Sequence, residues 1–268
     1  MSAIRPAAVA GSFYPGDPSA LAAEVAAYIA EAAPGGTHAP APKAIIAPHA
    51  GYIYSGAIAA SIYARLAPLR GIVRRVVLAG PAHRVYVRGA AIPAVDAFAS
   101  PLGAVRLDLP ALARLRELDF VEVSDAAHAL EHSLEVHLPF LQSVLGEVAL
   151  VPIVVGDATP REMARLFGLL WGGDETLIVV SSDLSHYLPY DAARGRDRDT
   201  ARAIVGLEAG LVPEQACGAA PINGLLEAAR ERGLRAEMVD LRNSGDTAGG
   251  LERVVGYGAF AFTETRHA

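Results

Sequence analysis

The chain has 268 residues, of which 52% are hydrophobic and 19% charged, and its formal net charge is −6. This composition excludes a largely disordered protein, because disordered chains combine low hydrophobicity with high net charge. The acidic balance argues against a nucleic-acid partner, since phosphate binding requires a strongly basic surface. The single cysteine, Cys217, excludes an intrachain disulfide framework and favours a cytoplasmic location.

The sequence shows no signal for export or membrane insertion. Prolines and glycines interrupt the N-terminal segment before an apolar core of signal-peptide length develops. No later stretch reaches the roughly 18 uninterrupted apolar residues that a spanning helix requires. We therefore expect no membrane partner.

The first predicted element is a helix, for which Asp17 is a suitable cap and Pro18 a favoured first residue. A segment rich in proline and glycine, residues 34–42, follows it and is too short to separate domains. Beyond this segment, short apolar runs rich in β-formers alternate with segments of helical periodicity. The predicted strands are residues 43–48, 74–80, 148–156, 176–183, 235–241 and 254–262. The predicted helices are residues 56–66, 131–145, 160–171, 197–208 and 220–233.

This alternation predicts the fold class. Continuous apolar runs between amphipathic helices are typical of strands that are buried on both faces of a parallel sheet. We therefore predict an α/β fold in which residues 1–268 form a single domain. Its central sheet should be mostly parallel, with helices on both faces.

The residues that follow the predicted strands are candidates for a functional site. In an open α/β sheet, ligands bind outside the carboxyl ends of the strands. A single histidine in such a place is more often a hydrogen-bonded loop residue than a ligand, but several equivalent positions are harder to attribute to chance. Four predicted strands are each followed by a side chain that can titrate and bind a metal: His49, His83, His186 and Asp246.

These side chains suggest a particular chemistry. Two histidines and one carboxylate form the facial triad of non-haem Fe(II) oxygenases, which leaves coordination positions open. We predict His49, His83 and Asp246 as metal ligands, with Fe(II) as the metal and Zn, Mn or Cu as alternatives. His186 is then the catalytic acid–base, because the pKa of imidazole lies near neutrality.

A second group of histidines and glutamates lies at residues 128–137, with a spacing unlike that of the zinc proteases. One interpretation is an amphipathic helix with a polar stripe. The other places Glu131 or His132 in the same crevice, where it binds substrate or orients a metal ligand. Tyr54 and Tyr187 are further candidates for substrate binding, because tyrosine has an apolar ring and a polar tip.

Other motifs carry less weight. The chain lacks a phosphate-binding loop, a dinucleotide fingerprint and a nucleophile elbow. Ser182, Asp183 and His186 could suggest a hydrolase triad, but their closeness in sequence gives no support for that geometry. We expect Cys217 to pack at the start of a helix, the alternative being a reactive thiol.

Six ordered motifs, RPAAVAGSFYPGDP, APHAGYIYSG, GPAH, EHSLEVHLPFLQ, PIVVGD and SSDLSHY, resemble the Memo family. Its bacterial and archaeal members are often labelled AmmeMemoRadiSam system protein B. The family is similar in fold to the class III extradiol (LigB-like) dioxygenases, in which two histidines and a glutamate hold Fe(II) and another histidine is the acid–base. The resemblance places His49, His83 and His186 at the matching positions. Asp246 stands where some members have a cysteine.

The resemblance and the four candidate residues lead to three hypotheses. The first is an Fe(II)-dependent, dioxygenase-like oxidoreductase that acts on a small molecule such as a phenol. The second is a non-enzymatic module that uses the same crevice to bind a metal, a peptide or a small ligand. The third is a metal-dependent hydrolase. The resemblance also implies a functional association with radical-SAM and AMMECR-like proteins.

Overall fold

The computed structural model describes residues 3–32 and 40–264, and most of the predicted linker lies outside these ranges. The centre of the main sheet consists of four parallel strands in the order β2 (Ala44–Ala47), β9 (Thr176–Ser181), β3 (Arg75–Pro81) and β8 (Ala149–Val155). Almost every residue of these strands is buried, as their continuous apolar sequences predict. They bring four carboxyl ends to one edge of the sheet.

Antiparallel strands flank this parallel centre, so the sheet is mixed. On one side β12 (Val254–Glu264) runs antiparallel to β2, and both β11 (Leu234–Asn243) and β10 (His186–Leu188) pair with β12. On the other side β4 (Ala90–Ile92) is antiparallel to β8 and parallel to β7 (Val121–Val123). The hairpin of β11 and β12 accounts for the antiparallel pairing of these two strands, because antiparallel neighbours need no crossover helix.

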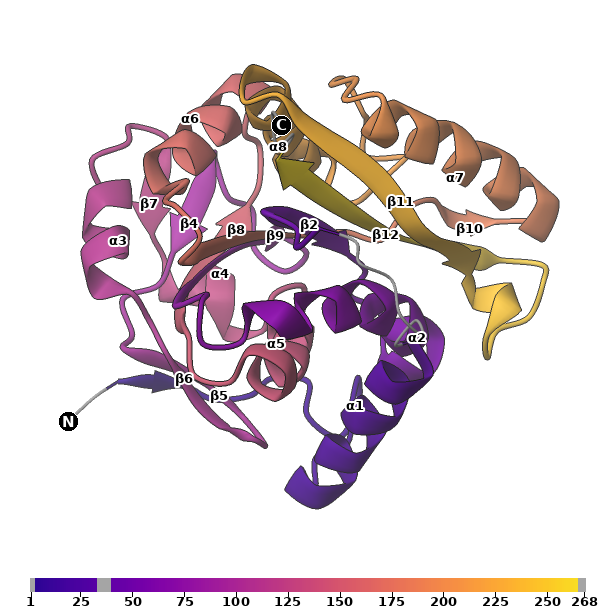
Figure 1. The fold of residues 1–268 in the computed structure, drawn as a ribbon, viewed down its shortest axis with the longest axis horizontal. Coiled ribbons are helices and arrows are strands. Elements are labelled where there is room, and N and C mark those ends of the chain that lie inside the picture. The colour runs from indigo at the N-terminus through magenta and orange to yellow at the C-terminus, as the bar shows by residue number, and fades with distance from the viewer. Residues whose placement is uncertain (1–2, 33–39, 265–268) are drawn as a thin grey trace.

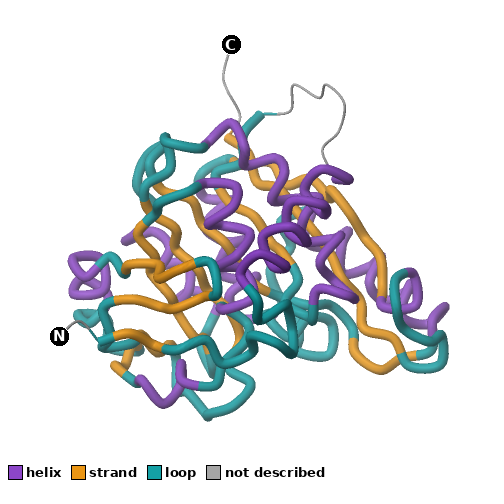
Figure 2. The backbone as a smooth tube through the Cα atoms, turned by 90° about the horizontal axis from the view of Figure 1, so that it is seen from below, coloured by secondary structure: helices purple, strands orange, loops and turns teal. Residues whose placement is uncertain are grey.

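Helices cover both faces of the sheet, which confirms the predicted fold class (Figures 1 and 2). One face carries α1, α2 and α5, and the other carries α6, α7 and α8 (Figure 1). A small sheet of β1 (Ile4–Arg5), β5 (Ala97–Ser100) and β6 (Gly103–Arg106) lies beside the main one. The helices are α1 (Pro18–Ala32), α2 (Tyr52–Tyr63), α3 (Leu109–Leu115), α4 (Asp125–Ala129), α5 (Leu138–Leu145), α6 (Pro160–Leu170), α7 (Tyr190–Val205) and α8 (Ala219–Glu231). Short 3₁₀ helices are η1 (Ala64–Leu69), η2 (Glu135–His137) and η3 (Ser244–Asp246).

The predicted helix at 131–145 is wrong in its first half. Residues 131–134 form a loop and turn, and regular α-helix begins only at Leu138. The Glu131 carboxylate accepts hydrogen bonds from the Ser133 amide and from His83, which is 48 positions away in sequence, and these bonds hold the chain away from helical geometry. Because residues 131–134 are not helical, the polar side chains of this segment do not form one stripe on a helix and face different parts of the molecule.

The N-terminal segment is attached to the core through one buried carboxylate. Glu135 is fully buried and forms an ion pair with Arg5, with 2.7 Å between the guanidinium nitrogen and the carboxylate oxygen. The same carboxylate accepts hydrogen bonds from the amides of Ala8 and Val9 and from the hydroxyl of Tyr14. A buried charge with this many donors is well compensated for its loss of hydration.

Two histidines in the core should make stability depend on pH. Burial lowers the pKa of His137 to about 3 and that of His128 to about 4. Because the unfolded chain binds these protons near pH 6.5, protonation favours unfolding as the pH falls from about 6.5 towards 4. We expect each histidine to reduce the free energy of unfolding by about 1.4 kcal/mol per pH unit within that window.

Urea denaturation of the wild type at pH 7, 6 and 5 measures this dependence, and His137→Leu is the informative variant. Its absolute stability can change in either direction, but its slope against pH should be smaller than that of the wild type. An identical slope in the two proteins would show that His137 is not held neutral by the fold.

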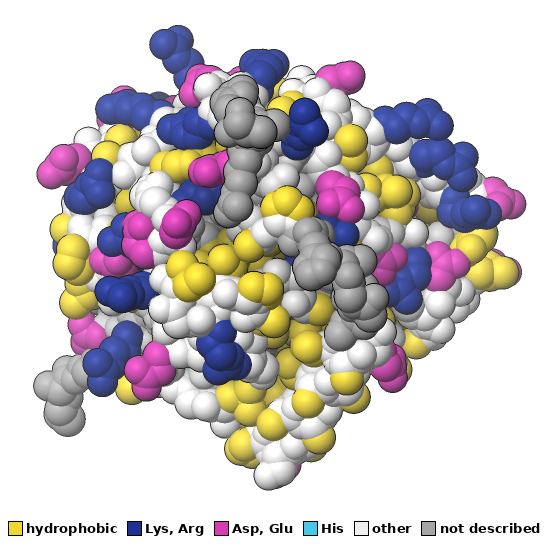
Figure 3. Space-filling model, viewed as in Figure 1, with side chains coloured by type: hydrophobic (Ala, Val, Ile, Leu, Met, Phe, Trp, Pro, Cys, Tyr) yellow, Lys and Arg dark blue, Asp and Glu magenta, His cyan; other side chains and the backbone are white. Residues whose placement is uncertain are grey.

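The outer surface is mixed in charge. On the face seen in Figure 3, acidic and basic side chains are interspersed with apolar ones, and no described histidine is visible there. None of the described helices combines the length and apolar character needed to cross a membrane.

Candidate metal centre

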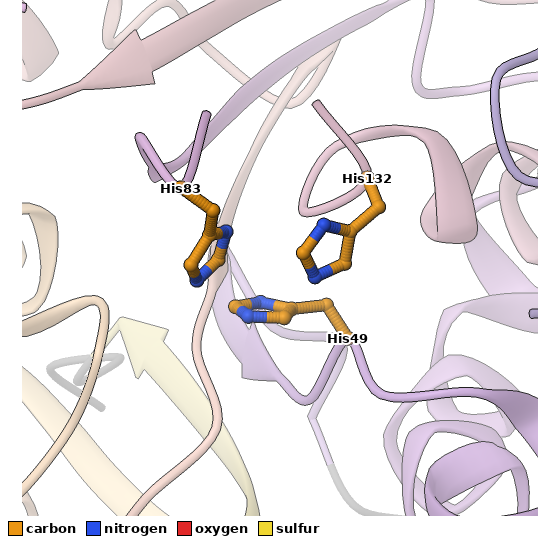
Figure 4. A group of neighbouring side chains, drawn as sticks. All are labelled: His49, His83 and His132. Atoms are coloured by element: carbon orange, nitrogen blue, oxygen red, sulfur yellow. The ribbon is translucent and has the colours of Figure 1, made fainter. Parts of the chain in front are cut away.

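Three histidines converge at the carboxyl edge of the sheet. His49 follows β2, His83 follows β3, and His132 comes from the loop between α4 and η2. One ring nitrogen of each lies within 4.8 Å of those of the other two, and Figure 4 shows the three rings turned toward a common point. Metal–imidazole bonds of about 2.0–2.1 Å would bring these nitrogens together around one ion with small side-chain movements.

The three histidines differ in their exposure to solvent. His49 is 2% exposed, whereas the side chains of His132 and His83 are 14% and 28% exposed. Burial lowers the pKa of His49 well below its usual value, with further lowering from His83, and burial lowers the pKa of His132 to about 4. Both rings are therefore neutral near pH 7, which is the form that binds metals.

Glu131 lies directly behind His83. Its carboxylate accepts the backbone N–H of His83 at 2.6 Å and the ring Nδ1–H at 2.9 Å. Burial acts to raise the pKa of Glu131, but hydrogen bonds from His83 and from the Ser133 amide outweigh it and lower the pKa to about 2. The ionised carboxylate thus holds His83 with Nε2 as the nitrogen available for a ligand, as carboxylates behind metal-bound histidines do.

The structure does not bring Asp246 into the histidine group. Asp246 is exposed in η3, and its carboxylate accepts hydrogen bonds from the Tyr190 hydroxyl and the Asn243 amide. Asn243 and Asp246 form a reciprocal cap at the end of β11, which explains why the carboxylate turns toward its own loop. Among the described residues, the group of possible ligands joins His49 and His83 with His132 instead.

Asp183 places a further carboxylate beside His49. The sequence suggests this residue only as a member of a hydrolase triad. Its Oδ1 accepts the backbone N–H of His49 at 2.8 Å, and its Oδ2 lies 4.0 Å from His49 Nε2. Burial raises the pKa of Asp183 to about 7. Local sequence patterns do not place Asp183 at this site. The strand order does, because β9 lies between β2 and β3, so that a residue after β9 lies between the ends of those two strands.

The remaining predicted residues are partly or largely exposed. His186 is half-buried, and burial lowers its pKa. The Tyr187 ring lies 5.7 Å from that of His186, and its backbone has φ +59°, a strained value for a residue other than glycine. Tyr54 is in the first turn of α2 and is 40% exposed. Burial raises the pKa of Tyr257, and the charge of Asp183 raises it further.

Cys217 precedes α8, consistent with the expected packing at the helix start, and it also contacts His49. Its Sγ lies 3.3 Å from His49 Nε2 and accepts the backbone N–H of Asp183 at 3.3 Å. Burial raises the pKa of the thiol to about 12, so that it is protonated near pH 7. A lone cysteine far from any histidine in sequence carries no signal for this contact.

The fold and these residues define a class of protein: an α/β domain with a mixed sheet and a cluster of histidines suited to a metal at its carboxyl edge. A family model described as Memo-like protein matches residues 5–261, and the chain belongs to this Memo family.

Similar sequences extend over almost the whole chain. A MEMO1 family protein of Aquifex aeolicus is 36% identical over 267 residues, covering 95% of this chain and 97% of the relative. Another, from Methanopyrus kandleri, is 34% identical over 281 residues, covering 96% and 98%. The crystal structure of an uncharacterized protein from Escherichia coli K12 is similar with a TM-score of 0.51 and 16% identity, over 80% of this chain and 98% of that one. This last similarity concerns the fold alone.

Proposed function

We propose that this protein is a metal-dependent oxidoreductase that resembles the non-haem Fe(II) dioxygenases and acts on a small molecule such as a phenol. The observation that carries the proposal is the convergence of His49, His83 and His132 with one ring nitrogen each within 4.8 Å of the others. The donor set fits such a metal, because imidazole suits iron, zinc and copper. The buried Nδ1 of His132 makes no hydrogen bond, and its nearest carboxylate oxygen, Oε1 of Glu131, lies 3.4 Å away, so hydrogen bonding does not commit the ring to another structural role.

The residues of such a site have different roles. The three histidines bind the metal, and Glu131 keeps the His83 ring in one orientation. A bound Fe(II) supplies redox chemistry and open coordination positions. His186, which begins β10 three positions after Asp183, moves the proton to or from the substrate hydroxyl. Tyr54 and Tyr187 are exposed and would contact an aromatic substrate.

Anaerobic loading with Fe(II), elemental analysis and oxygen uptake with a panel of catechols test this proposal together. The wild type should bind about one ion per chain, because one group of three histidines defines one centre. His83→Ala should lose the ion, whereas His186→Ala should keep it and lose oxygen uptake. If the wild type binds no metal, the proposal fails. If His186→Ala retains every measurable function, a non-enzymatic binding role replaces it.

The all-histidine set favours a second candidate, a metal-dependent hydrolase. Three histidines with an open fourth position are the ligands of the catalytic zinc in carbonic anhydrase, whereas the iron facial triad includes a carboxylate. Freshly purified protein should then contain Zn or Mn rather than Fe. It should also turn over ester substrates without consuming oxygen.

A further inference from the structure

We propose that Ser181 sets the tautomer of His49 and so presents its Nε2 to the metal. This inference rests on the proposed metal centre and assigns a positioning role to a residue behind it. Ser181 is the last residue of β9 and is fully buried. Its hydroxyl oxygen lies 2.6 Å from His49 Nδ1.

The direction of the hydrogen bonds follows from counting protons. The Ser181 hydroxyl donates its one hydrogen to the backbone carbonyl of Ser133 at 2.6 Å, since a carbonyl oxygen can only accept. The bond between Ser181 and His49 must therefore be donated by the ring, from Nδ1–H to the hydroxyl oxygen. A neutral imidazole carries one N–H, so Nε2 of His49 keeps a free lone pair.

Ser133 connects this arrangement to the other two histidines. Its backbone N–H donates to Glu131 Oε1 at 2.9 Å, and the same oxygen accepts Nδ1–H of His83 and lies 3.4 Å from Nδ1 of His132. Its own hydroxyl donates to the carbonyl of Pro81 at the end of β3. One network of Ser181, Ser133 and Glu131 thus faces the Nδ1 side of all three rings and leaves Nε2 of each for the ion.

Space around the network is limited. A Cβ added at Gly80 would lie 2.9 Å from the Ser133 hydroxyl and 3.1 Å from Ser181 Cβ. The serines are therefore packed against the β3 backbone and have little freedom to turn away. This rigidity is what a positioning role requires, because a ligand held in one orientation needs no reordering when the metal binds.

Loss of the Ser181 hydroxyl would leave His49 Nδ1–H buried without an acceptor. The ring should then move its proton to Nε2, where the Cys217 sulfur lies 3.3 Å away and can accept it. A protonated Nε2 cannot bind a metal. We expect Ser181→Ala to weaken Zn²⁺ and Fe²⁺ binding by about 10–100-fold, the usual range for a residue behind a metal ligand.

Two measurements on the full chain test the inference. Ser185→Ala is the matched control, because Ser185 is as buried as Ser181 but its backbone amide donates to Asp197 and not to a histidine. The first is the tautomer of His49 in metal-free protein, from ¹⁵N NMR, with its signals assigned by their absence in His49→Ala. The second is Zn²⁺ binding by calorimetry. The expected result is Nδ1–H in the wild type and in Ser185→Ala, and Nε2–H with weakened binding in Ser181→Ala.

The inference is overturned if the wild type carries Nε2–H, if Ser181→Ala keeps both the tautomer and the affinity, or if Ser185→Ala loses affinity equally. Failure of the proposed function is a separate result. A wild type that binds Zn²⁺ and Fe²⁺ without oxygen uptake, but shows the expected effect of Ser181→Ala, refutes the oxidoreductase and supports the role of Ser181.

Discussion

His132→Ala should lower the affinity for Fe(II) or Zn(II) by more than about 100-fold, whereas Asp246→Asn should change it by less than about threefold. The loss should exceed the 10–100-fold range for residues behind a metal ligand, because His132 is itself within the group of possible ligands. Asp246 is exposed, and its carboxylate is committed to Tyr190 and Asn243. Calorimetric titration of metal-free protein under nitrogen measures both variants.

The pair of variants decides between two ligand sets. Two histidines and Asp246 are the facial triad that the sequence predicts, and three histidines are the group that the structure brings together. Far-ultraviolet circular dichroism of each variant controls for misfolding. A large loss in Asp246→Asn with little loss in His132→Ala would show that the loop at η3 rearranges to bring its carboxylate to the ion.

Glu135→Ala should reduce the free energy of unfolding by about 3–5 kcal/mol, the usual effect of removing one partner of a buried ion pair. The substitution leaves the Arg5 guanidinium buried without its carboxylate, and it also removes the acceptor for two amides and the Tyr14 hydroxyl. Each buried donor that is left without an acceptor reduces the free energy of unfolding further. Guanidinium chloride denaturation at pH 7 measures the change.

An exposed ion pair provides the control. Arg202 and Asp199 are neighbours on α7 with side chains about 70% exposed, and Arg202→Ala should change the free energy of unfolding by no more than about 0.5 kcal/mol. If Glu135→Ala were equally mild, the N-terminal segment would not depend on this carboxylate for its attachment.

Hydrophobic patterning was sufficient to predict most of the fold. The six predicted strands correspond to β2, β3, β8, β9, β11 and β12, because long apolar runs have few alternatives to a buried sheet. The strands at 90–92 and 121–123 were not predicted, since three residues are too few to establish a period. The direction of β12 was also beyond local patterning, because pairing with β2 is a property of the assembled sheet.

The candidate site was predicted in part. His49 and His83 lie close together because β2 and β3 both flank β9, and their places after two strands made this expectation reasonable. The sequence predicts a role for His132 in substrate binding or ligand orientation, and the structure places its ring in the group of possible ligands. No strand delivers it, and its position depends on a loop that Glu131 holds against His83.

By itself, the sequence determined the class of fold, the edge of the sheet where chemistry-bearing residues gather, and the family. These follow from periodicity and from motifs, which are local properties of the chain. Only the tertiary structure decided which side chains share a centre. Ring orientation at His49 depends on Ser181, 132 positions away, and the placing of Asp183 and Cys217 beside that ring depends on strand order and on the start of α8. Contacts between residues so distant in sequence form only when the sheet and its helices pack together.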